Sequence, residues 1–443
     1  METPKQHWLI LAHCFNMDGR AASQTITDRL PYLMQHGITP VVVSAPTGEK
    51  DTRFPHIQTI SPAPSGLIFE LRHIIKKGKI PPVWQSFFKI VISISCLPFY
   101  LLERVFVHLD SHWSWFITAA GKSLSLIKKY QPVLIYSTAG PSSTHLAGYL
   151  LHRITGIPWL AELHDPLVHK QGPRSWQRRR FNVWLEKTIC RHAAGVIFFT
   201  ENALASARQR NPELAHKGHV LRPGANPPDF SAATYKKREQ IHFGHFGSLD
   251  ANRNLGAFME LLDRLAWEQP EFREVLRLDV FGSNLDPVSQ KAWQQLGHRQ
   301  LVNLHGRLEY DPVSGKSGRQ RVMEMMRQSD ILLLLHGQGS GCAQYIPSKL
   351  YEYLMTRRPI LAVSADDSEL ADILLKLGHM VVTEDDGEAF ASVVKNIYRQ
   401  WQREDGLADG TAGSHYTVAK TVRQLLAIAG DIIRQPESTG KGS

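Results

Sequence analysis

Short, continuous apolar runs alternate with longer segments of helical periodicity through the first half of the chain. Such runs are typical of parallel strands that are buried on both faces. They lie at 7–12, 39–44, 133–137, 159–163 and 194–200. Because parallel strands are joined by a long crossover, usually a helix, the alternation predicts a doubly wound α/β domain.

The same alternation returns in the second half. Its apolar runs lie at 241–247, 276–281, 302–307, 330–336, 359–364 and 379–383. A Pro- and Gly-rich segment, 219–230, separates the two halves and is typical of a domain boundary. We therefore predict an N-terminal domain at 1–222 and a C-terminal domain at 223–405. A last region, 406–443, is expected to hold a helix at 417–434 and a disordered tail.

Residues 62–110 break this alternation. Basic residues come first: Arg72, His73, Lys76, Lys77 and Lys79. An apolar segment follows, but its charge-free core, Ile90–Leu102, is shorter than the roughly 20 residues that a transmembrane helix needs, and Pro98 interrupts it. A basic stretch beside an apolar one favours a helix lying in a membrane interface. A helical insertion buried in the N-terminal domain is the alternative.

Composition and charge narrow the classes of function. The chain has 443 residues, of which 43% are hydrophobic and 21% charged, and this is globular composition for two domains. The net charge of +10 suits nucleic acid, an anionic membrane or a phosphorylated substrate. No recognised nucleic-acid module accompanies the basic residues, so nucleic acid is not expected. Four cysteines without metal-site spacing, and an N-terminus without a long apolar run, predict a cytoplasmic protein without a signal peptide.

The segment Tyr345–Pro359 carries the clearest chemical signal. Pro347 and Ser348 predict a helix start, with Ser348 as the N-cap. The first N–H groups, the positive end of the helix dipole and Lys349 together make an anion site. Glu352, one turn further on, has a carboxylate that can accept hydrogen bonds from a ribose diol. An ordinary capped helix with a solvated Lys and Glu is the alternative.

This segment resembles the nucleotide-sugar signature of the family-4 glycosyltransferases, which are retaining enzymes of the GT-B fold. The family carries a Glu-x7-Glu motif in a Pro-Ser-Lys-Leu-x-Glu-Tyr-Leu context. Glu352 matches the second Glu, and Gln344 stands at the position of the first. The resemblance implies that Glu352 binds the ribose of the donor. It also implies that Pro347, Ser348 and Lys349 bind the diphosphate. Gln344 keeps the capacity for hydrogen bonds without the charge.

The resemblance also covers several predicted strand ends. The donor-binding candidates there are Gly19, Arg20, Gly247, Arg253 and Arg307. Arg253 retains one diphosphate-binding cation, whereas Ser248 replaces the Arg that the family has beside it. Arg307 is implied to contact the nucleobase. The loop at Gly19 is implied to lie between the donor phosphate and the acceptor, and a plain turn that needs Gly is the alternative.

The predicted strand at 159–163 ends in His164 and Asp165. Ligands of doubly wound sheets bind beyond the carboxyl ends of the strands. We therefore expect His164 to contact the transferred sugar or the acceptor, and we place His164, Asp165 and Gln344 in the catalytic set. The alternative for His164 is a surface residue that caps a turn.

The resemblance covers most of the chain and implies the α/β GT-B fold, in which two doubly wound Rossmann-like domains face each other across a cleft. It implies that the last helix returns to the first domain. The implied function is retaining transfer of a sugar from a nucleoside-diphosphate sugar to an acceptor hydroxyl. The implied setting is cell-surface polysaccharide or glycolipid assembly on an acceptor glycan, which can be lipid-linked, at the inner face of the membrane.

Two other functions fit the same architecture: a sugar-nucleotide epimerase, and a non-catalytic subunit that binds a nucleotide sugar. We expect no cofactor and no metal. Acidic pairs at 366–367 and 385–386 read as solvated loop charges rather than as metal ligands. Residues Arg253, Lys349 and the N–H groups at Ser348 are expected to stabilise the leaving diphosphate in place of a metal.

Overall fold

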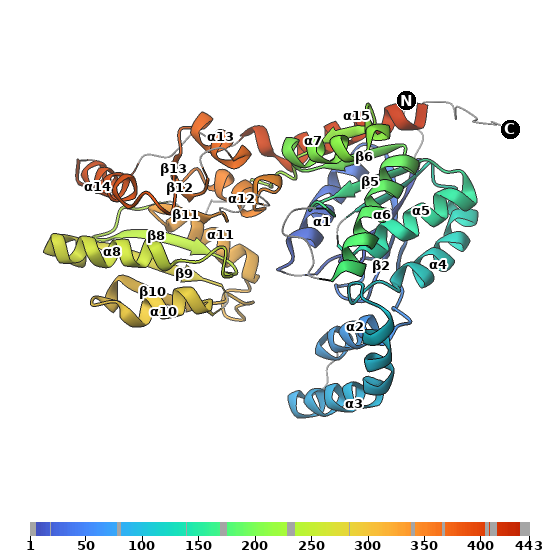
Figure 1. Cartoon of the computed structure of the whole chain (residues 1–443), viewed down its shortest axis with the longest axis horizontal. Coiled ribbons are helices and arrows are strands. Elements are labelled where there is room, and N and C mark those ends of the chain that lie inside the picture. Colours follow the sequence, from blue (N-terminus) through green and yellow to red (C-terminus); the bar gives the residue numbers. More distant parts are fainter. Residues whose placement is uncertain are drawn as a thin grey trace. The chain divides into compact units, whose positions relative to one another are not determined.

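The computed structural model describes residues 6–17, 19–77, 81–138, 140–168, 175–227, 235–282, 284–337, 342–365, 368–403, 407 and 414–434. The chain divides into two compact units, Met1–Pro223 with Val418–Ser443, and Gly224–Thr417 (Figure 1). The second unit therefore extends to Thr417, beyond the end at residue 405 that the sequence suggested. The expected tail, 435–443, lies outside the described residues.

A seven-stranded sheet forms the centre of the first unit, and all of its paired strands run parallel. In spatial order the strands are β3 (His56–Gln58), β2 (Ile38–Ser44), β1 (Gln6–Leu11), β4 (Leu134–Thr138), β5 (Trp159–Leu163), β6 (Gly195–Phe198) and β7 (Gly218–Val220). The order of the strands reverses between β1 and β4. Ligands of doubly wound sheets bind at the carboxyl side of such a switch point.

Helices cover both faces of this sheet. They are α1 (Ala21–Gln35), α4 (Trp115–Tyr130), α5 (Ser142–Thr155), α6 (Trp176–His192), α7 (Glu201–Arg210) and α15 (Val418–Arg434). Successive strand residues point to opposite faces. Leu9 and Leu11 accordingly pack with α4, α5, α6 and α7, whereas Trp8 and Ile10 pack with α1 and α15. Burial on both faces explains why the strands are continuous apolar runs in the sequence.

The last helix, α15, belongs to the first unit although the second unit precedes it in the chain. Its buried residues include Val418, Val422, Leu425, Ala429 and Ile432. Their spacing of three and four places them on one face of the helix. That face packs in the same core as Trp8 and Ile10, and α15 contacts α1 and β6.

A six-stranded sheet forms the centre of the second unit, and its paired strands also run parallel. In spatial order they are β10 (Val302–Gly306), β9 (Leu276–Phe281), β8 (Ile241–Phe246), β11 (Ile331–Leu335), β12 (Ile360–Val363) and β13 (Met380–Val382). The helices are α8 (Gly256–Glu268), α9 (Pro270–Val275), α10 (Pro287–Gln295), α11 (Gly318–Gln328), α12 (Lys349–Thr356), α13 (Glu369–Lys376) and α14 (Gly387–Arg403). The switch point lies between β8 and β11.

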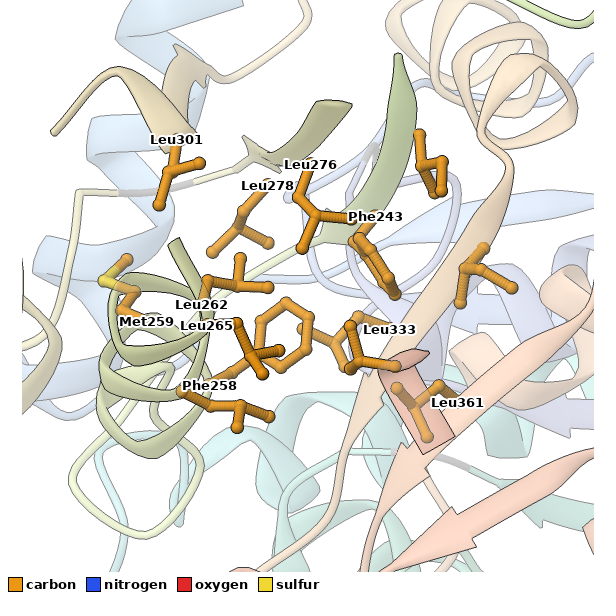
Figure 2. Packing of buried hydrophobic residues seen from close by; sticks show 14 of the residues in the cluster. Phe243, Phe258, Met259, Leu262, Leu265, Leu276, Leu278, Leu301, Leu333 and Leu361 are labelled. Atoms are coloured by element: carbon orange, nitrogen blue, oxygen red, sulfur yellow. The ribbon is translucent and has the colours of Figure 1, made fainter. Parts of the chain in front are cut away.

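One core of the second unit joins the sheet to α8 and α14. Figure 2 shows Phe258, Leu262 and Leu265 of α8 against Phe243 and Leu333 of the central strands. The opposite core contains residues of α11, α12 and α13, so this sheet too is covered on both faces. The two doubly wound units confirm the predicted α/β Rossmann-like architecture.

The segment that breaks the sequence pattern forms a helical hairpin of α2 (Pro64–Lys77) and α3 (Pro82–Phe106). The hairpin follows the end of β3 in the chain, and in Figure 1 it projects from the rest of the first unit. Pro98 removes one backbone donor but lies inside an uninterrupted α3, so the predicted break there is wrong. The alternative of a buried insertion is also wrong, because Phe99 and Phe106 are 64% and 78% exposed. By length and composition alone, Val83–Phe106 would suffice to cross a membrane. One such helix is weak evidence for a membrane span.

A buried ion pair joins α1 to the middle of the first sheet. Arg29 Nη1 donates to Glu162 Oε2 at 2.5 Å and to the hydroxyl of Tyr136 at 2.8 Å. Both side chains of the ion pair are fully buried. Burial opposes the charge on Glu162, yet Arg29 and then His164 lower the pKa of this carboxyl below its usual range. The pair therefore fixes α1 against β4 and β5.

We predict that Arg29→Met lowers the free energy of unfolding by about 3–5 kcal/mol, because it leaves the buried Glu162 carboxylate without its cation. Urea denaturation followed by circular dichroism measures the change. Asp431→Ala is the matched control, since it breaks the exposed Arg434 pair and should cost less than about 1 kcal/mol. Equal effects of the two variants would contradict the prediction.

Candidate active site

The candidate donor residues of the second unit gather at the carboxyl edge of its sheet. Gly247 follows β8, His336 follows β11, and α12 begins at Lys349. The strands β8 and β11 border the switch point, where this class of sheet binds its ligands. The sequence placed Gly247 and Lys349 in one site, and the fold brings them together.

Lys349 lies directly over Gly247. A β-carbon at Gly247 would lie 1.8 Å from Nζ of Lys349, and the backbone there has a φ of +119°, so only glycine fits. Burial first, and the nearby Arg253 cation second, lower the pKa of Lys349 to about 8. A partly desolvated ammonium group beside bare backbone is well suited to a phosphate.

The start of α12 differs from the sequence expectation in one respect. Ser348 precedes the helix, but its side chain makes no capping hydrogen bond because its backbone is already helical, with φ −57° and ψ −27°. The N–H groups of Leu350 and Tyr351 donate to the carbonyls of Pro347 and Ser348. Within the described part of the chain, the N–H groups of Ser348 and Lys349 have no backbone acceptor. These two N–H groups are therefore available to bind an anion.

Arg253, the second expected cation, already binds a carboxylate. Its Nε and Nη2 lie 2.9 and 2.5 Å from Oδ2 of Asp250. Its side chain is nevertheless 34% exposed, and its charge lowers the pKa values of both Lys349 and His336. Arg253 therefore belongs to the same positive cluster, with part of its charge compensated by Asp250.

Glu352 faces a partner that the sequence did not suggest. Arg319, near the start of α11, donates through Nη2 to Oε1 of Glu352 at 3.2 Å. Both side chains are partly exposed, at 35% and 20%. The only sequence signal was the capping box at Ser317 and Gln320, which starts α11 but says nothing of what the helix end contacts. The carboxylate of Glu352 is thus held in place and still open to solvent.

The last donor candidate of the second unit, Arg307, and the catalytic candidate Gln344 lie at the same edge. Arg307 is exposed directly after β10. Gln344 ends a short 3-10 helix, Cys342–Gln344, three residues before Pro347, and is half-buried. The Gly-rich loop before it, 338–341, lies outside the described residues, as do the acidic residues 366–367. Within the ranges that the structure describes, no three metal-ligating side chains come together.

In the first unit, His164 lies at the end of β5 as expected. Its Nε2 lies 2.8 Å from Oε1 of Glu162 and 3.2 Å from Oγ1 of Thr138. Its ring packs on Phe199 with centroids 4.4 Å apart. The side chain is 11% exposed. His164 is therefore an oriented side chain with one accessible edge rather than a freely moving surface residue.

Asp165, Gly19 and Arg20 are exposed at the same edge of the sheet. Gly19 has a φ of +70°, which supports the turn that the sequence suggested. Arg20 is the N-cap of α1, in an extended conformation. Asp18 and His169 lie outside the described residues.

His13 was not identified from the sequence, although it lies just beyond β1, at the switch point of the first sheet. Its Nε2 lies 3.2 Å from Oε1 of the buried Glu70 on α2. Burial opposes protonation of His13, but the contacts with Cys14 and Glu70 raise its pKa above the ordinary value. The neighbouring His112 ring, 4.5 Å away, has its pKa lowered to about 3 by burial and by His13. The sequence gives no signal for this cluster, because Glu70 on α2 is 57 positions from His13 along the chain.

Comparisons with known proteins bear on the family and the fold. Residues 100–224 match the family described as "Glycosyl transferase 4-like domain". The chain carries a glycosyl transferase 4-like domain on a GT-B fold. This supports its assignment as a glycosyltransferase. No curated protein matches the chain significantly.

Solved structures share the fold of this chain at low identity. Anabaena HepE in complex with UDP-glucose is 13% identical with a TM-score of 0.58, over 96% of this chain and 100% of that one. The apo lipopolysaccharide outer core galactosyltransferase WaaB is 12% identical with a TM-score of 0.57, over 96% and 99%. A UDP-forming α,α-trehalose-phosphate synthase from Burkholderia vietnamiensis is 11% identical with a TM-score of 0.61, over 98% and 100%.

We predict that donor affinity falls as the pH rises above about 8, the pKa to which burial lowers Lys349. Below this pH Lys349 is charged and attracts the diphosphate. Above it, binding must take up a proton, so Kd rises by up to about tenfold for the first pH unit. Titration calorimetry with UDP measures the profile.

Lys349→Met should bind more weakly and should lose this pH dependence. Lys376→Met, on the exposed end of α13, should keep the wild-type slope. A wild-type profile that stays flat through this range would exclude Lys349 from the diphosphate site.

Proposed function

We propose that the chain is a retaining glycosyltransferase that moves a sugar from a nucleoside-diphosphate sugar to an acceptor hydroxyl. The observation that carries the proposal is Lys349 lying over Gly247 at the switch point, with Glu352 one turn along the same helix. With this spacing, Lys349 and the N–H groups would bind a diphosphate. The carboxylate of Glu352 would bind the ribose next to it. UDP is the first nucleotide to test, because HepE was solved with UDP-glucose.

The chemical task of this site is to stabilise the departing diphosphate. As the bond between the anomeric carbon and the phosphate oxygen breaks, negative charge builds on the diphosphate. Lys349, the exposed part of Arg253 and the N–H groups at the start of α12 are placed to neutralise it. We propose that these groups act without a metal ion, and that no further cofactor takes part.

For the transfer step we propose substitution on one face of the sugar. The acceptor oxygen bonds to the anomeric carbon on the side that the phosphate leaves, and the hydroxyl proton passes to the departing phosphate oxygen. Gln344 lacks the charge to act as a nucleophile, and it would instead orient the sugar by hydrogen bonds. His164, held by Glu162 and Thr138, and the neighbouring Asp165 are proposed to contact the sugar or the acceptor.

The remaining donor contacts are proposed from their positions at strand ends. Arg307 would contact the nucleobase, and the Gly19–Arg20 turn would lie between the donor phosphate and the acceptor. We further propose that the enzyme assembles cell-surface polysaccharide or glycolipid at the cytoplasmic face of a membrane. Its acceptor would be a lipid-linked glycan, reached through peripheral contact of the α2–α3 hairpin.

We predict that one nucleotide sugar in a panel of UDP-, GDP-, ADP- and dTDP-sugars raises the melting temperature of the wild type. At a ligand concentration of one hundred times Kd the stabilisation is about 2.7 kcal/mol. Glu352→Gln keeps the size of the side chain but weakens its acceptance of ribose hydrogen bonds, so the shift should shrink.

Glu388→Gln is the matched control, because Glu388 is 91% exposed and pairs with Arg264 outside the candidate site. It should keep the full shift. A panel without any shift would contradict the proposed donor site, and an equal shift in both variants would remove Glu352 from it.

We also predict that Lys349→Met lowers kcat/KM for transfer by about 10²–10³-fold, the range for loss of one charge-stabilising group. Proton NMR of the product should show that the transferred sugar keeps the anomeric configuration that it has in the donor. The epimerase alternative is favoured if the sugar of the donor changes configuration with no acceptor present. The non-catalytic alternative is favoured if the donor binds but no acceptor lipid gives turnover.

A further inference from the structure

A basic pocket lies between the two helices of the projecting hairpin. Its volume is about 500 Å³, and it is lined by Arg72, His73, Lys89, Ile90, Ser93 and Ile94. Arg72 and Lys89 supply the positive charge. The apolar residues, Ile90 and Ile94, both lie on α3. The pocket thus combines positive charge with an apolar wall, outside the candidate sugar-transfer site.

The charges of this pocket have no carboxylate partner in the described residues. Arg72 Nη2 donates only to the hydroxyl of Ser93, at 3.2 Å. Glu70 on α2 instead binds Ser61 and His13. Glu103 on α3 binds Ser65 and the indole N–H of Trp113. Since both carboxylates of the hairpin are engaged elsewhere, Arg72 and Lys89 are available to an external anion.

The helix α3 turns its polar side inward and its apolar side outward. The half-buried positions recur at helical spacing and are mostly polar: Gln85, Lys89, Ser93, Cys96, Tyr100 and Glu103, with the apolar Ile92 beside them. The exposed apolar residues include Trp84 at 56%, Phe87 at 52% and Phe99 at 64%. In an ordinary surface helix the apolar stripe faces the core. This reversed orientation leaves an apolar face that the described part of the chain does not cover, as at protein or membrane interaction sites.

We propose that the α2–α3 hairpin docks on an anionic bilayer, with the phosphate of an anionic phospholipid held by Arg72 and Lys89. The lipid chains lie along the apolar outer face of α3. His73 Nδ1 donates to the carbonyl of Phe69, 2.9 Å away, so Nε2 can donate to the headgroup only when the ring is protonated. Basic residues beside exposed Trp and Phe are the chemistry of interfacial helices. This inference deepens, and rests on, the membrane contact of the proposed function.

The hairpin is also tied to the first unit at its base. Glu70 joins α2 to the end of β1 through His13, and Glu103 joins α3 to Ser65 and Trp113. A docked hairpin therefore holds the carboxyl edge of the first sheet, with His164, in one orientation to the membrane surface. A lipid-linked acceptor would be presented from that surface.

The test is co-sedimentation of the full chain with phosphatidylcholine vesicles, with and without phosphatidylglycerol. The wild type should bind strongly only to the anionic vesicles. Arg72→Gln with Lys89→Gln should lower the partition coefficient on anionic vesicles roughly thirtyfold, at the usual contribution of two basic residues. Trp84→Ser with Phe87→Ser should lower binding to both kinds of vesicle.

The matched control is Lys395→Gln with Arg399→Gln on α14, which removes the same charge from the second unit. It should bind anionic vesicles like the wild type. Equal losses in the two charge variants would overturn the phosphate pocket, because binding would then follow net charge alone. No vesicle binding, together with a dimer that Trp84→Ser with Phe87→Ser dissociates, would assign the face to a second copy of the chain.

The nucleotide-sugar thermal shift should be unchanged in every hairpin variant, because no hairpin residue belongs to the donor site. This readout separates the two proposals. Vesicle binding without any donor shift would contradict the proposed function and leave the lipid site standing. A donor shift without vesicle binding would overturn the lipid site alone.

Discussion

Burial of both faces of each parallel sheet is the constraint on which the rest of this structure depends. Alternate residues of β1 pack into different cores, and the same holds for the central strands of the second unit. A covered face leaves no room for a ligand, so polar chemistry is confined to the edges where the strands end. Every candidate site residue that the structure describes lies at such an edge or in the helix that follows it.

At these edges, small residues decide which charged side chains can lie against the backbone. Lys349 reaches the end of β8 only because Gly247 has no side chain, and a β-carbon at Gly282 would lie 2.2 Å from the carbonyl oxygen of Gly247. The positive charge is then partly desolvated, which makes it costly in the empty site and favourable beside a diphosphate. The same logic holds in the first unit, where Arg29 keeps Glu162 ionised and Glu162 in turn orients His164.

The sequence predicted those features that depend on local pattern. Continuous apolar runs located the strands, and the Pro-Ser-Lys start located α12 and its candidate anion-binding groups. It did not predict Arg319 opposite Glu352, Arg29 beside Glu162, or Glu70 beside His13, because 33, 133 and 57 residues separate these partners. Only tertiary packing brings them together. The expected capping bond of Ser348 also failed, because its backbone conformation is set by the turn before the helix.

The hairpin shows where the pattern of polar and apolar residues misleads. Pro98 suggested a break, and burial in the N-terminal domain was the alternative to a helix in a membrane interface, yet α3 is continuous and points its apolar side outward. Burying a Phe or Leu side chain stabilises a fold by about 1.5–3 kcal/mol, so a helix that leaves several of them in water gives up that stabilisation within its own unit. The cost is recovered only where the outer face finds an apolar environment. Because Arg72 and Lys89 lie beside that face, we propose that an anionic membrane supplies both the apolar medium and the counter-charge.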